Sequence, residues 1–578
     1  MITFLLYNFN NISQSKLPKD ATCAPIIIAT DKTQLTQFVG GKSAYPVYLT
    51  LGNIPKGLRR KPSERACILI GYLPVDTAIL KSSNLSQQKV GIRNQRLFHE
   101  AMRIILEPLI KAGTEGVLMT GGDGAVRRVY PILACYVADF PEQCLVSCSK
   151  YGTCPKCRTP ANDLQNPTPA TARSSKWTLD VIKMAKASGK SSKFYQSCMS
   201  EDVSGSVYVP FWKDLPLCNI HQSITPDVLH QLYQGVLKYL ISWCQSLMTI
   251  EELDARVRSL PPAFGVRHFK NGFSVLSQIQ GPERKHMAKI LLGCLVGSVA
   301  SDGIKAIKAL LDFIYIAQYK THNGTTLQYL QDALDAFHAH KDFFIETTLR
   351  PHLNIPKFHS LLHYIESIKF FGTTDNYNTE AFERFHIDFA KEGWRASNHR
   401  DEFPQMINWL SRQEKISMFE SYMDNMLSSK NPPSKPTLLS QRPVPRVAKF
   451  PPFPSRHLTT IETKFNAPHF SHKLKEYLNK FTLNPASRST LPNYPLPFQH
   501  VDVYSQFKFN AHSLWEEGDD PVYEPMTVKA LPISTANPHG RFDTIVALWN
   551  DDAESTGVVG MSIRHPFQFV FLHLRIYL

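Results

Sequence analysis

The sequence predicts an α/β fold that carries a large all-α insertion and ends in a small β-rich unit. Three observations support this fold class. In the first 160 residues, four short apolar runs are separated by turns and by one amphipathic helix, which is the pattern of a buried sheet. From 214 to 348 the apolar residues recur at helical spacing instead. A proline-dense stretch at 431–454 separates that block from short strand-like runs.

The length and composition indicate a folded chain of several units. A chain of 578 residues is long enough for two or three domains, and 43% hydrophobic residues can bury a sizeable core. We expect six segments in chain order: a leader at 1–24, the first part of the α/β core at 25–160, an exposed connection and the helical insertion at 161–350, a candidate metal-ligand helix with the final core helices at 351–428, a proline-rich linker at 429–460 and the β-rich unit at 461–578.

The charge and the cysteine usage restrict the partners and the compartment. A net charge of +15 favours a polyanionic partner, with nucleic acid as the first candidate and a basic protein without such a partner as the alternative. Eleven cysteines with one CxxC pair suit a reducing compartment. No signal peptide is recognisable, and the most apolar later run, 290–300, is too short to span a bilayer. We therefore expect a soluble nuclear or cytosolic protein.

Two predicted strands are each followed closely by an aspartate. The first strand runs from Pro25 to Thr30 and is followed by Asp31, and the fourth ends at Val137, just before Asp139. Between them we expect strands at 45–52 and 67–74 and a helix at 95–113. A ribonuclease-H-like nuclease core uses this order and these two acidic positions. Aspartates at strand ends also occur in other α/β folds.

These acids could hold metal ions for phosphodiester chemistry. That chemistry uses two divalent cations held by two or three carboxylates, and Mg²⁺ suits the role because it prefers hard oxygen ligands. Asp31 and Asp139 are the first two candidate ligands. The third should lie on a late helix that packs on the sheet, where Glu383 or Glu380 fits. The alternative is a turn acid at Asp31 and glutamates that pair with arginines on a solvated helix face.

A second candidate metal site combines cysteines with histidines. Cys154 and Cys157 form a CxxC pair, and His359 and His363 lie at i and i+4 on one predicted helix face. Together they make a workable tetrahedral zinc set, which would join the end of the fourth strand to the helix before Glu383. The alternatives are a free CxxC with two unrelated histidines, or a redox CxxC, for which a thioredoxin-like context is missing.

Other polar residues could support the site or bind DNA. Asp227 and His230 could place an acid and an imidazole on neighbouring turns of a helix, or be an N-terminal acid and a packed histidine. Clustered cations near the acids could bind phosphates, although each could be an ordinary solvated side chain. The candidates are Lys56, Arg59, Arg60, Lys61, Arg127, Arg128, Lys391, Arg395 and Arg400.

Several segments, taken in their order along the chain, resemble one transposase family. They are Pro25–Leu35, Ala44–Ser63, Thr120–Arg128, Ala138–Gln143, Cys154–Cys157, Phe211–Pro216, Thr225–Lys238, Asn378–Asn398 and Gly540–Thr544. Together they are similar to Plavaka-type transposases of the CACTA (EnSpm) group, a DDE transposase family abundant in fungal genomes. The resemblance extends from about residue 25 to 545 and is more specific than any single motif.

The resemblance implies a fold, a reaction and a set of residues. It implies a ribonuclease-H-like catalytic domain that cuts at transposable-element ends and joins a 3′ hydroxyl to target DNA with two Mg²⁺ or Mn²⁺ ions. Asp31 matches the first acid, Asp139 the second and Glu383 the third, with Glu380 as the fallback. Asp227 and His230 match the D-x-x-H signature of the group. The V(D)J recombinase, a distant relative, uses a CxxC and a later histidine pair as zinc ligands, which supports the zinc set above.

The resemblance also sets expectations about partners and completeness. It implies double-stranded DNA at the element ends and the target, a homo-oligomer and a nuclear location. Family members usually carry an N-terminal cysteine–histidine finger region, and this sequence starts too close to the first strand to hold one. We therefore expect a copy that is truncated, mis-spliced or decayed, with an intact catalytic core and impaired recognition of specific DNA ends. The rival hypotheses are a catalytically decayed or domesticated DNA-binding protein and a nuclease of the same fold that acts on RNA or hybrids.

Overall fold

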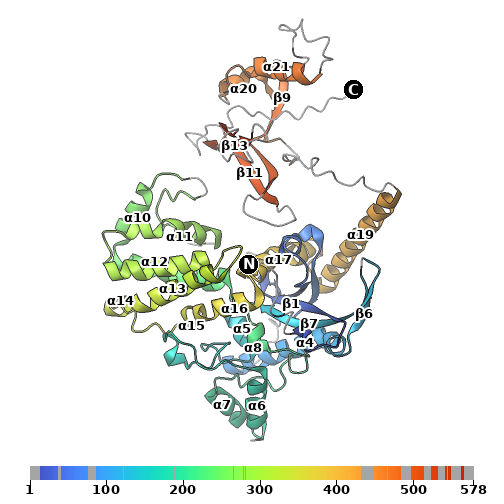
Figure 1. The fold of residues 1–578 in the computed structure, drawn as a ribbon, viewed down its shortest axis with the longest axis vertical. Helices are drawn as coiled ribbons and strands as arrows, with labels where there is room; N and C mark the ends of the chain where they lie inside the picture. The colour runs from blue at the N-terminus through green and yellow to red at the C-terminus, as the bar shows by residue number, and fades with distance from the viewer. Residues whose placement is uncertain are drawn as a thin grey trace. The chain divides into compact units, whose positions relative to one another are not determined.

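The computed structural model of the protein consists of two compact units, Met1–Glu420 and Ser421–Leu578, and each is described by itself (Figure 1). Within them it describes residues 9, 13–36, 41–75, 86–121, 123–187, 189–263, 266–276, 279, 281–430, 448, 451–464, 467–482, 496, 498–512, 523–531, 541–542, 545–548 and 561–564.

The first unit is built on a mixed five-stranded sheet in the order β5-β4-β1-β7-β6. Its strands are β1 (Ala21–Thr30), β4 (Pro46–Leu51), β5 (Cys67–Tyr72), β6 (Val117–Thr120) and β7 (Val126–Val137). β1 and β7 pair in parallel, and the other neighbours are antiparallel. The four expected strands are confirmed, and the α/β class with them.

Two strand features differ from the expectation. β1 begins at Ala21, so its first residues lie in the segment expected as a leader. β6 is not among the expected strands, and every residue of it is exposed. β6 pairs with the first residues of β7 and extends the edge of the sheet. Its apolar run, Val117 to Met119, is only three residues long and shows no alternation, so the sequence pattern does not distinguish it from a loop.

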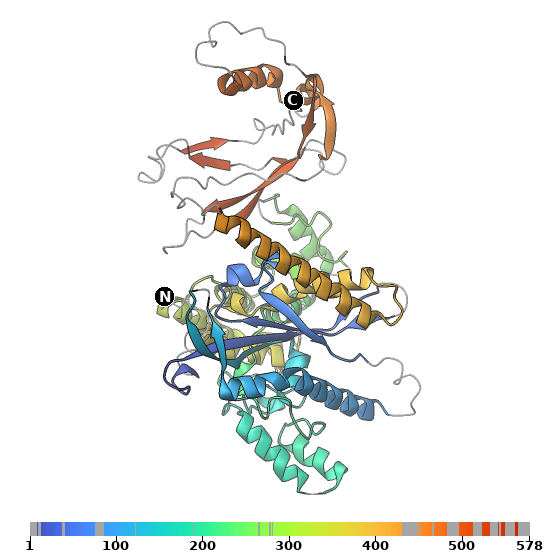
Figure 2. The same ribbon diagram turned by 90° about the vertical axis from the view of Figure 1, so that its right-hand side faces the viewer.

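The two faces of the sheet carry different helices. On one face, Ile26 and Ile28 pack with Phe98 and Met102 of α4 (Gln87–Glu115), which Figure 2 shows along one side of the strands. α4 was expected at 95–113 and is longer, with Ser86 as its N-cap. Pro108 lies inside it and does not end it. On the opposite face, alternate residues of β1 pack with the late helices, as the period of a strand requires.

The expected helical block is confirmed and has a core of its own. Its helices gather in one part of the first unit (Figure 1). They are α9 (Leu237–Leu247), α10 (Ile250–Ser259), α11 (Gly281–Leu295), α12 (Ser301–Ile316), α13 (Gly324–His340) and α14 (Phe343–Glu346). The block is preceded by α8 (Ile220–Ser223) and by the π-helix η3 (Val228–Val236).

The segment expected as an exposed connection is partly folded. It contains α6 (Ser175–Lys186) and α7 (Ser191–Ser200), which bury Val181, Ile182 and Cys198 in a small core of their own. The many Ser and Lys residues of this stretch suggested a loop, but they lie on the solvent faces of two short amphipathic helices. A minority of apolar residues at helical spacing is enough to pack a helix pair.

The late helices return to the open face of the sheet. They are α15 (Pro356–His359), the 3₁₀ turn η4 (Ser360–His363), α16 (Tyr364–Phe371), α17 (Thr379–His386), the π turn η6 (Ile387–Lys391), α18 (Glu392–Arg395) and α19 (Glu402–Lys430). Phe382 and Phe385 of α17 join Ile27 and Tyr48 in the core on this face. Short elements complete the unit: β2 (Thr33–Gln34), β3 (Ser43–Ala44), α2 (Lys56–Arg59), α5 (Phe140–Ser147) and the 3₁₀ turns η1 (Pro62–Glu64), η2 (Ala161–Asp163) and η5 (Thr374–Asn376).

The second unit mixes strands with two helices. Its elements are β8 (Phe453–His457), α20 (Leu458–Lys464), α21 (Phe470–Thr482), β9 (His500–Val503), β10 (Gln506–His512), β11 (Tyr523–Leu531), β12 (Arg541–Phe542), β13 (Ile545–Leu548) and β14 (Met561–Arg564). Most of the predicted proline-rich linker at 429–460 lies outside the described residues. Within the described part of the chain, every helix is too short or too polar to cross a membrane.

Candidate active site and metal centre

The pairing of β1 with β7 brings the first two predicted acids together. The two strands are parallel, and Ala29 of β1 lies opposite Val137 of β7. Asp31 and Asp139 each follow these paired residues by two positions. Because neighbouring parallel strands end at the same edge of a sheet, the register alone places the two carboxylates side by side.

Asp139 has a local structural role as well. It is the N-cap of α5, and its Oδ1 accepts a hydrogen bond from the backbone N–H of Glu142 at 3.0 Å. Pro141 lies in the first helical turn, where its missing N–H costs nothing. Phe140 and Pro141 therefore begin this helix directly after Asp139. The cap fixes the carboxylate at the sheet edge.

The third predicted acid reaches the same place from the late helices. One pocket at the sheet edge is lined by Asp31, Asp139 and Glu383. Its other lining residues are His230, Thr379, Phe382 and the last residues of β1 and β7. Glu383 lies on α17, and its side chain is 37% exposed. Three carboxylates that are up to 352 positions apart in the chain therefore share one pocket.

The fallback acid lies elsewhere. Glu380 is on α17 as well, but its carboxylate pairs with Lys285 of α11 at 2.8 Å and accepts a hydrogen bond from Asn378 at 3.1 Å. Glu380 does not line the pocket of the three acids. The geometry therefore distinguishes two glutamates that the sequence left as alternatives, and it favours Glu383.

Of the two D-x-x-H residues, His230 lines the pocket and Asp227 contacts His230. Asp227 is the N-cap of the π-helix η3, and its Oδ2 lies 2.6 Å from Nδ1 of His230. Nε2 of His230 lies 3.3 Å from Oε1 of Glu383. Thr379, four residues before Glu383, donates to Oδ1 of Asp227 at 2.7 Å. Asp227 thus orients His230, and both connect the start of the helical block to α17.

The electrostatics of the pocket favour a bound cation. Burial raises the pKa values of Asp139 and Glu383, and neighbouring carboxylates, Asp31 among them, raise them further. Burial alone would lower the pKa of His230, but the hydrogen bond and charge of Asp227, with the charges of Glu383 and Asp139, raise it to about 9. Three carboxylates in one pocket repel one another, and a divalent cation would relieve that repulsion.

A buried glutamate that is not among the predicted site residues contacts the end of β1. Glu142 is 8% exposed, and its carboxyl group accepts a hydrogen bond from Thr30, the residue before Asp31. Burial raises its pKa well above the usual range of a glutamate. Tyr136 also bonds to Thr30, at 2.8 Å. The position three residues after an aspartate N-cap was visible in the sequence, but its burial depends on the tertiary fold.

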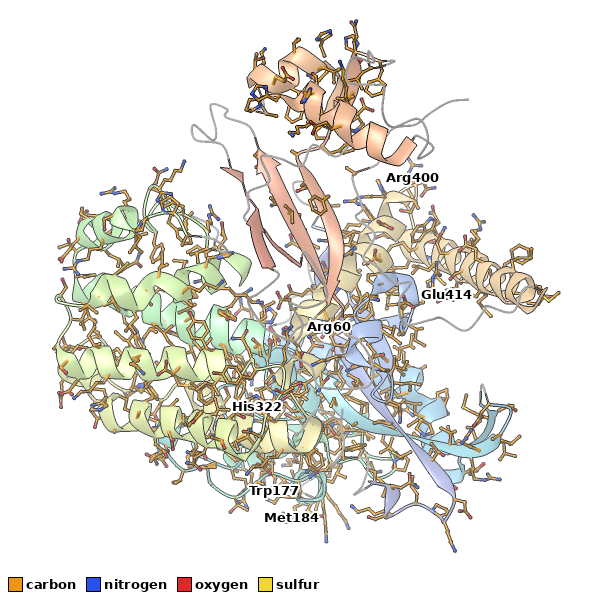
Figure 3. All side chains as sticks on the ribbon, turned by 45° about the horizontal axis from the view of Figure 1, so that its top comes forward. Arg60, Trp177, Met184, His322, Arg400 and Glu414 are labelled. Carbon is orange, nitrogen blue, oxygen red and sulfur yellow. The ribbon has the colours of Figure 1, made fainter. Side chains whose placement is uncertain are left out.

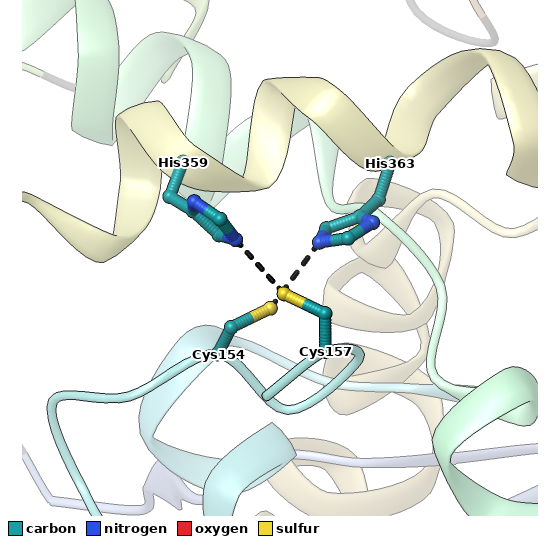
Figure 4. A group of neighbouring side chains, drawn as sticks. All are labelled: Cys154, Cys157, His359 and His363. Atoms are coloured by element: carbon teal, nitrogen blue, oxygen red, sulfur yellow. Dashed lines mark hydrogen bonds between the residues drawn. The ribbon is translucent and has the colours of Figure 1, made fainter. Parts of the chain in front are cut away.

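The predicted cysteine–histidine set forms a compact cluster. Cys154, Cys157, His359 and His363 are all buried, and their ligand atoms lie within 4.8 Å of one another (Figure 4). Nε2 of His359 is 3.1 Å from the sulfur of Cys157, and Nε2 of His363 is 3.3 Å from that of Cys154. Two thiols and two imidazoles at this separation could hold a metal ion, and they fit the tetrahedral preference of Zn²⁺.

Neighbouring groups orient the ligands of this cluster. Nδ1 of His359 lies 3.1 Å from the carbonyl oxygen of Leu164, which leaves Nε2 for the metal side. The buried guanidinium of Arg173 donates to the carbonyl oxygens of Cys154 and Cys157 at 2.9 Å each. Hydrogen bonds from Cys154, His359 and His363 lower the pKa of Cys157, so a thiolate is favoured there. The chain therefore supplies both the ligands and their supports.

The predicted DNA-binding cations divide into two groups. Arg59 is 5% exposed and donates to the carbonyl oxygens of Ile54 and Asn376, and burial lowers its pKa to about 10. A phosphate contact by Arg59 would require it to leave the core, so its role is structural. Lys56 pairs with Asp375 at 2.9 Å, and Arg127 pairs with Asp123. The exposed members are Arg60, Lys61, Arg127, Arg128, Arg395 and Arg400, while Lys56 and Lys391 are half-buried; Figure 3 labels Arg60 and Arg400.

A comparison with protein families supports the resemblance found in the sequence. Residues 5–244 match the model of the Plavaka transposase family. This part of the chain is therefore similar to Plavaka transposases. No protein of curated function matches the chain. The Plavaka match contains Asp31, Asp139, the two cysteines and the Asp227–His230 pair, while Glu383 and the two cluster histidines lie beyond it.

Proposed function

We propose that this Plavaka-type protein is a DDE transposase that cuts phosphodiester bonds at element ends and joins 3′ hydroxyl ends to target DNA. The observation that carries the proposal is the pocket in which Asp31, Asp139 and Glu383 meet. The family match independently favours transposase chemistry, and transposases bind DNA. Action on genomic DNA would place the protein in the nucleus.

The topology supports a ribonuclease-H-like core. Three antiparallel strands, β1, β4 and β5, are followed by a helix and by β7, which returns parallel to β1. The two aspartates lie at the ends of these parallel strands. The third acid arrives on α17 after the helical block from α9 to α14, which we interpret as an insertion into the core. β6 pairs antiparallel with β7 and is not one of the strands on which the assignment of a ribonuclease-H-like core rests.

We infer that the three carboxylates hold two Mg²⁺ or Mn²⁺ ions. Such ions activate the attacking oxygen and stabilise the leaving oxygen in phosphodiester cleavage. Asp31, Asp139 and Glu383 would supply hard oxygen ligands. Asp227 orients His230 beside Glu383, and the N-cap bond of Asp139 keeps that side chain at the sheet edge. Exposed cations such as Arg60, Lys61 and Arg395 would hold the phosphate backbone.

We also infer that the cluster of two cysteines and two histidines holds a structural Zn²⁺. All four ligands are buried, which suits a closed structural site. The zinc would join the segment after α5 to α15, and α15 carries Lys357, whose Nζ donates to the carbonyl oxygen of His230 at 2.9 Å. The cluster would therefore help to position the acidic pocket without contacting DNA.

The test is metal-dependent cleavage of duplex DNA by the purified full chain. We expect cleavage with Mg²⁺ or Mn²⁺, and a loss of at least about 100-fold in Asp139→Asn, which keeps the N-cap oxygen but removes the charge. A matched control is Glu100→Gln, an exposed acid on α4 outside the pocket, which should leave the rate unchanged.

The outcome that would contradict the proposal is equally specific. A folded, zinc-loaded chain that cleaves neither end-containing nor unrelated DNA, yet retains it in a binding assay, would favour a decayed or domesticated DNA-binding protein. Cleavage that persists in Asp139→Asn would place the reaction at another site. Preference for RNA or hybrid substrates would indicate a nuclease of the same fold.

A further inference from the structure

A histidine that is not among the predicted site residues contacts the first acid of the pocket. His386 lies on α17, three residues after Glu383, and its side chain is 6% exposed. Its Nε2 lies 3.2 Å from Oδ2 of Asp31. Its Nδ1 lies 2.9 Å from the hydroxyl oxygen of Tyr48. The His386 ring therefore connects Tyr48 within the sheet to Asp31 at the edge where the acids meet.

The partner that anchors His386 is rigidly held. Tyr48 lies on β4 and is fully buried. Its ring packs against Phe382, Phe385 and Phe389, with centroids 5.7 to 6.3 Å apart. A buried tyrosine surrounded by three rings has little freedom to turn, so its hydroxyl is a fixed point. The orientation of the His386 ring follows from that point.

The partners of His386 determine which atom donates in each of its two hydrogen bonds. An ionised Asp31 can only accept, so Nε2 of His386 must carry the proton that it donates. In the neutral ring Nδ1 then accepts from the Tyr48 hydroxyl. This arrangement occupies Oδ2 of Asp31 and leaves Oδ1 for another partner. It also limits the rotation of a side chain that is 43% exposed and would otherwise be mobile.

The same pattern occurs at the third acid. His230 is anchored through Nδ1 to Asp227 and directs Nε2 at Glu383. His386 is anchored through Nδ1 to Tyr48 and directs Nε2 at Asp31. Two of the three acids thus each have one anchored imidazole. Because positions three apart share a helix face, α17 supplies one acid of the pocket and orients another.

We propose that His386, anchored by Tyr48, is a positioning residue that orients Asp31 for the divalent cation of the pocket. The inference rests on the proposed function, because it concerns one of the three acids. His386 neither touches the reacting atoms nor replaces a ligand. Groups that orient metal ligands commonly change metal affinity or activity by 10- to 100-fold when they are removed.

The experiment measures Mn²⁺ binding and cleavage separately. Calorimetric titration of the zinc-loaded full chain with Mn²⁺ gives a Kd, and the site of interest is the one whose binding is lost in Asp139→Asn. In a second measurement, the cleavage rate as a function of Mn²⁺ concentration gives kcat and the apparent KM for Mn²⁺. The variants are His386→Leu, which removes both bonds, His386→Gln, whose amide N–H can reach the position of Nε2, and Tyr48→Phe, which removes the anchor alone.

A matched control is His322→Leu. His322 is also a buried histidine, 1% exposed, with a hydroxyl partner in Thr326, and it does not line the pocket. We expect His386→Leu to weaken Mn²⁺ binding at least about 10-fold and to raise the apparent KM for Mn²⁺. The Mn²⁺ affinity of His386→Gln should stay within about threefold of wild type, and that of Tyr48→Phe should lie between those of the two His386 variants. The control should lower the melting temperature without changing the Mn²⁺ affinity.

Different outcomes overturn different statements. Equal Mn²⁺ affinity in wild type and in a folded His386→Leu or Tyr48→Phe variant would overturn the positioning role alone. A His386→Gln variant as weak as His386→Leu would overturn it too, because the donor would then not matter. Absence of Mn²⁺ binding sensitive to Asp139→Asn in wild type would overturn the proposed metal chemistry and this inference with it.

Discussion

The cysteine–histidine cluster and the carboxylate pocket are two candidate metal sites of the first unit. They differ in the elements that supply their ligands, in the exposure of those ligands and in how the ligands interact. The cluster takes its ligands from the segment after α5 and from α15 and η4, and all four are buried. The pocket takes its ligands from the ends of β1 and β7 and from α17, and Asp31 and Glu383 are 43% and 37% exposed. Enclosure suits a structural ion, and accessibility suits a substrate.

The ligands also interact differently among themselves. In the cluster each imidazole lies within hydrogen-bond distance of a thiol, so the ligands attract one another. In the pocket like charges face one another, and the pKa values of Asp139 and Glu383 are raised. The comparison suggests that the cluster contributes to folding, whereas the pocket costs stability to keep acids where a cation can bind. Four predictions test this contrast.

The largest effect should follow from opening the cluster. Cys157→Ala removes one ligand and leaves three buried polar groups without their ion. Because metal binding at such a site is folding free energy, we expect loss of zinc and destabilisation of the first unit by several kcal/mol, on the order of 5 or more. Zinc content and thermal unfolding measure it. Cys198→Ala, a fully buried cysteine in the α6–α7 core, should cost only about 1 kcal/mol; equal effects of the two variants would refute a metal role.

The second effect concerns activity alone. Glu383→Gln removes a charge from the pocket, and Glu380→Gln removes one from the same helix less than a turn away. We expect the first to lower the cleavage rate by at least about 100-fold and the second by less than about 10-fold, since Glu380 is paired with Lys285 outside the pocket. Single-turnover rates at saturating Mn²⁺ compare them. A reversed order would make Glu380 the third acid.

The third effect is a pH dependence of stability in the metal-free pocket. The folded pKa of His230 is about 9, above the ordinary value near 6.5. The stabilisation from the charged ring is therefore complete below about pH 6.5 and is lost as the pH rises through about 9, about 3 kcal/mol in total. Unfolding between pH 6 and 10 measures it. His230→Gln should flatten the slope, and an unchanged slope would contradict the charged pair.

The smallest effect has the opposite sign to the first. Asp139→Asn keeps the N-cap of α5 but removes one of the repelling charges whose burial is unfavourable. We expect the melting temperature of the metal-free protein to stay level or rise by a few degrees, and the stabilisation by added Mn²⁺ to disappear. Differential scanning calorimetry with and without Mn²⁺ compares the two proteins. A marked fall in the metal-free melting temperature would mean that the carboxylate stabilises the fold.

Much of this arrangement could be predicted because local patterns carried it. The apolar runs before Asp31 and Asp139 indicated two buried strands, and CxxC with HxxxH indicated a ligand set. The pattern could not identify β6, because its apolar run of three residues, Val117 to Met119, is too short to predict a strand. Nor could it separate Arg59 from Arg60: the two are neighbours in one basic run, yet one is buried and the other exposed.

The sequence by itself determined the residues that chemistry requires and the elements that carry them, because strand periods, helix caps and ligand spacing are local properties. Only the tertiary structure decided which of these residues meet. The parallel register of β1 and β7 aligned two aspartates, and the return of α17 selected Glu383 over Glu380. The tertiary structure also brings together Tyr48 of β4, His386 of α17 and Asp31, which directly follows β1. Such contacts depend on how far-apart segments pack, and that information is spread over the whole core.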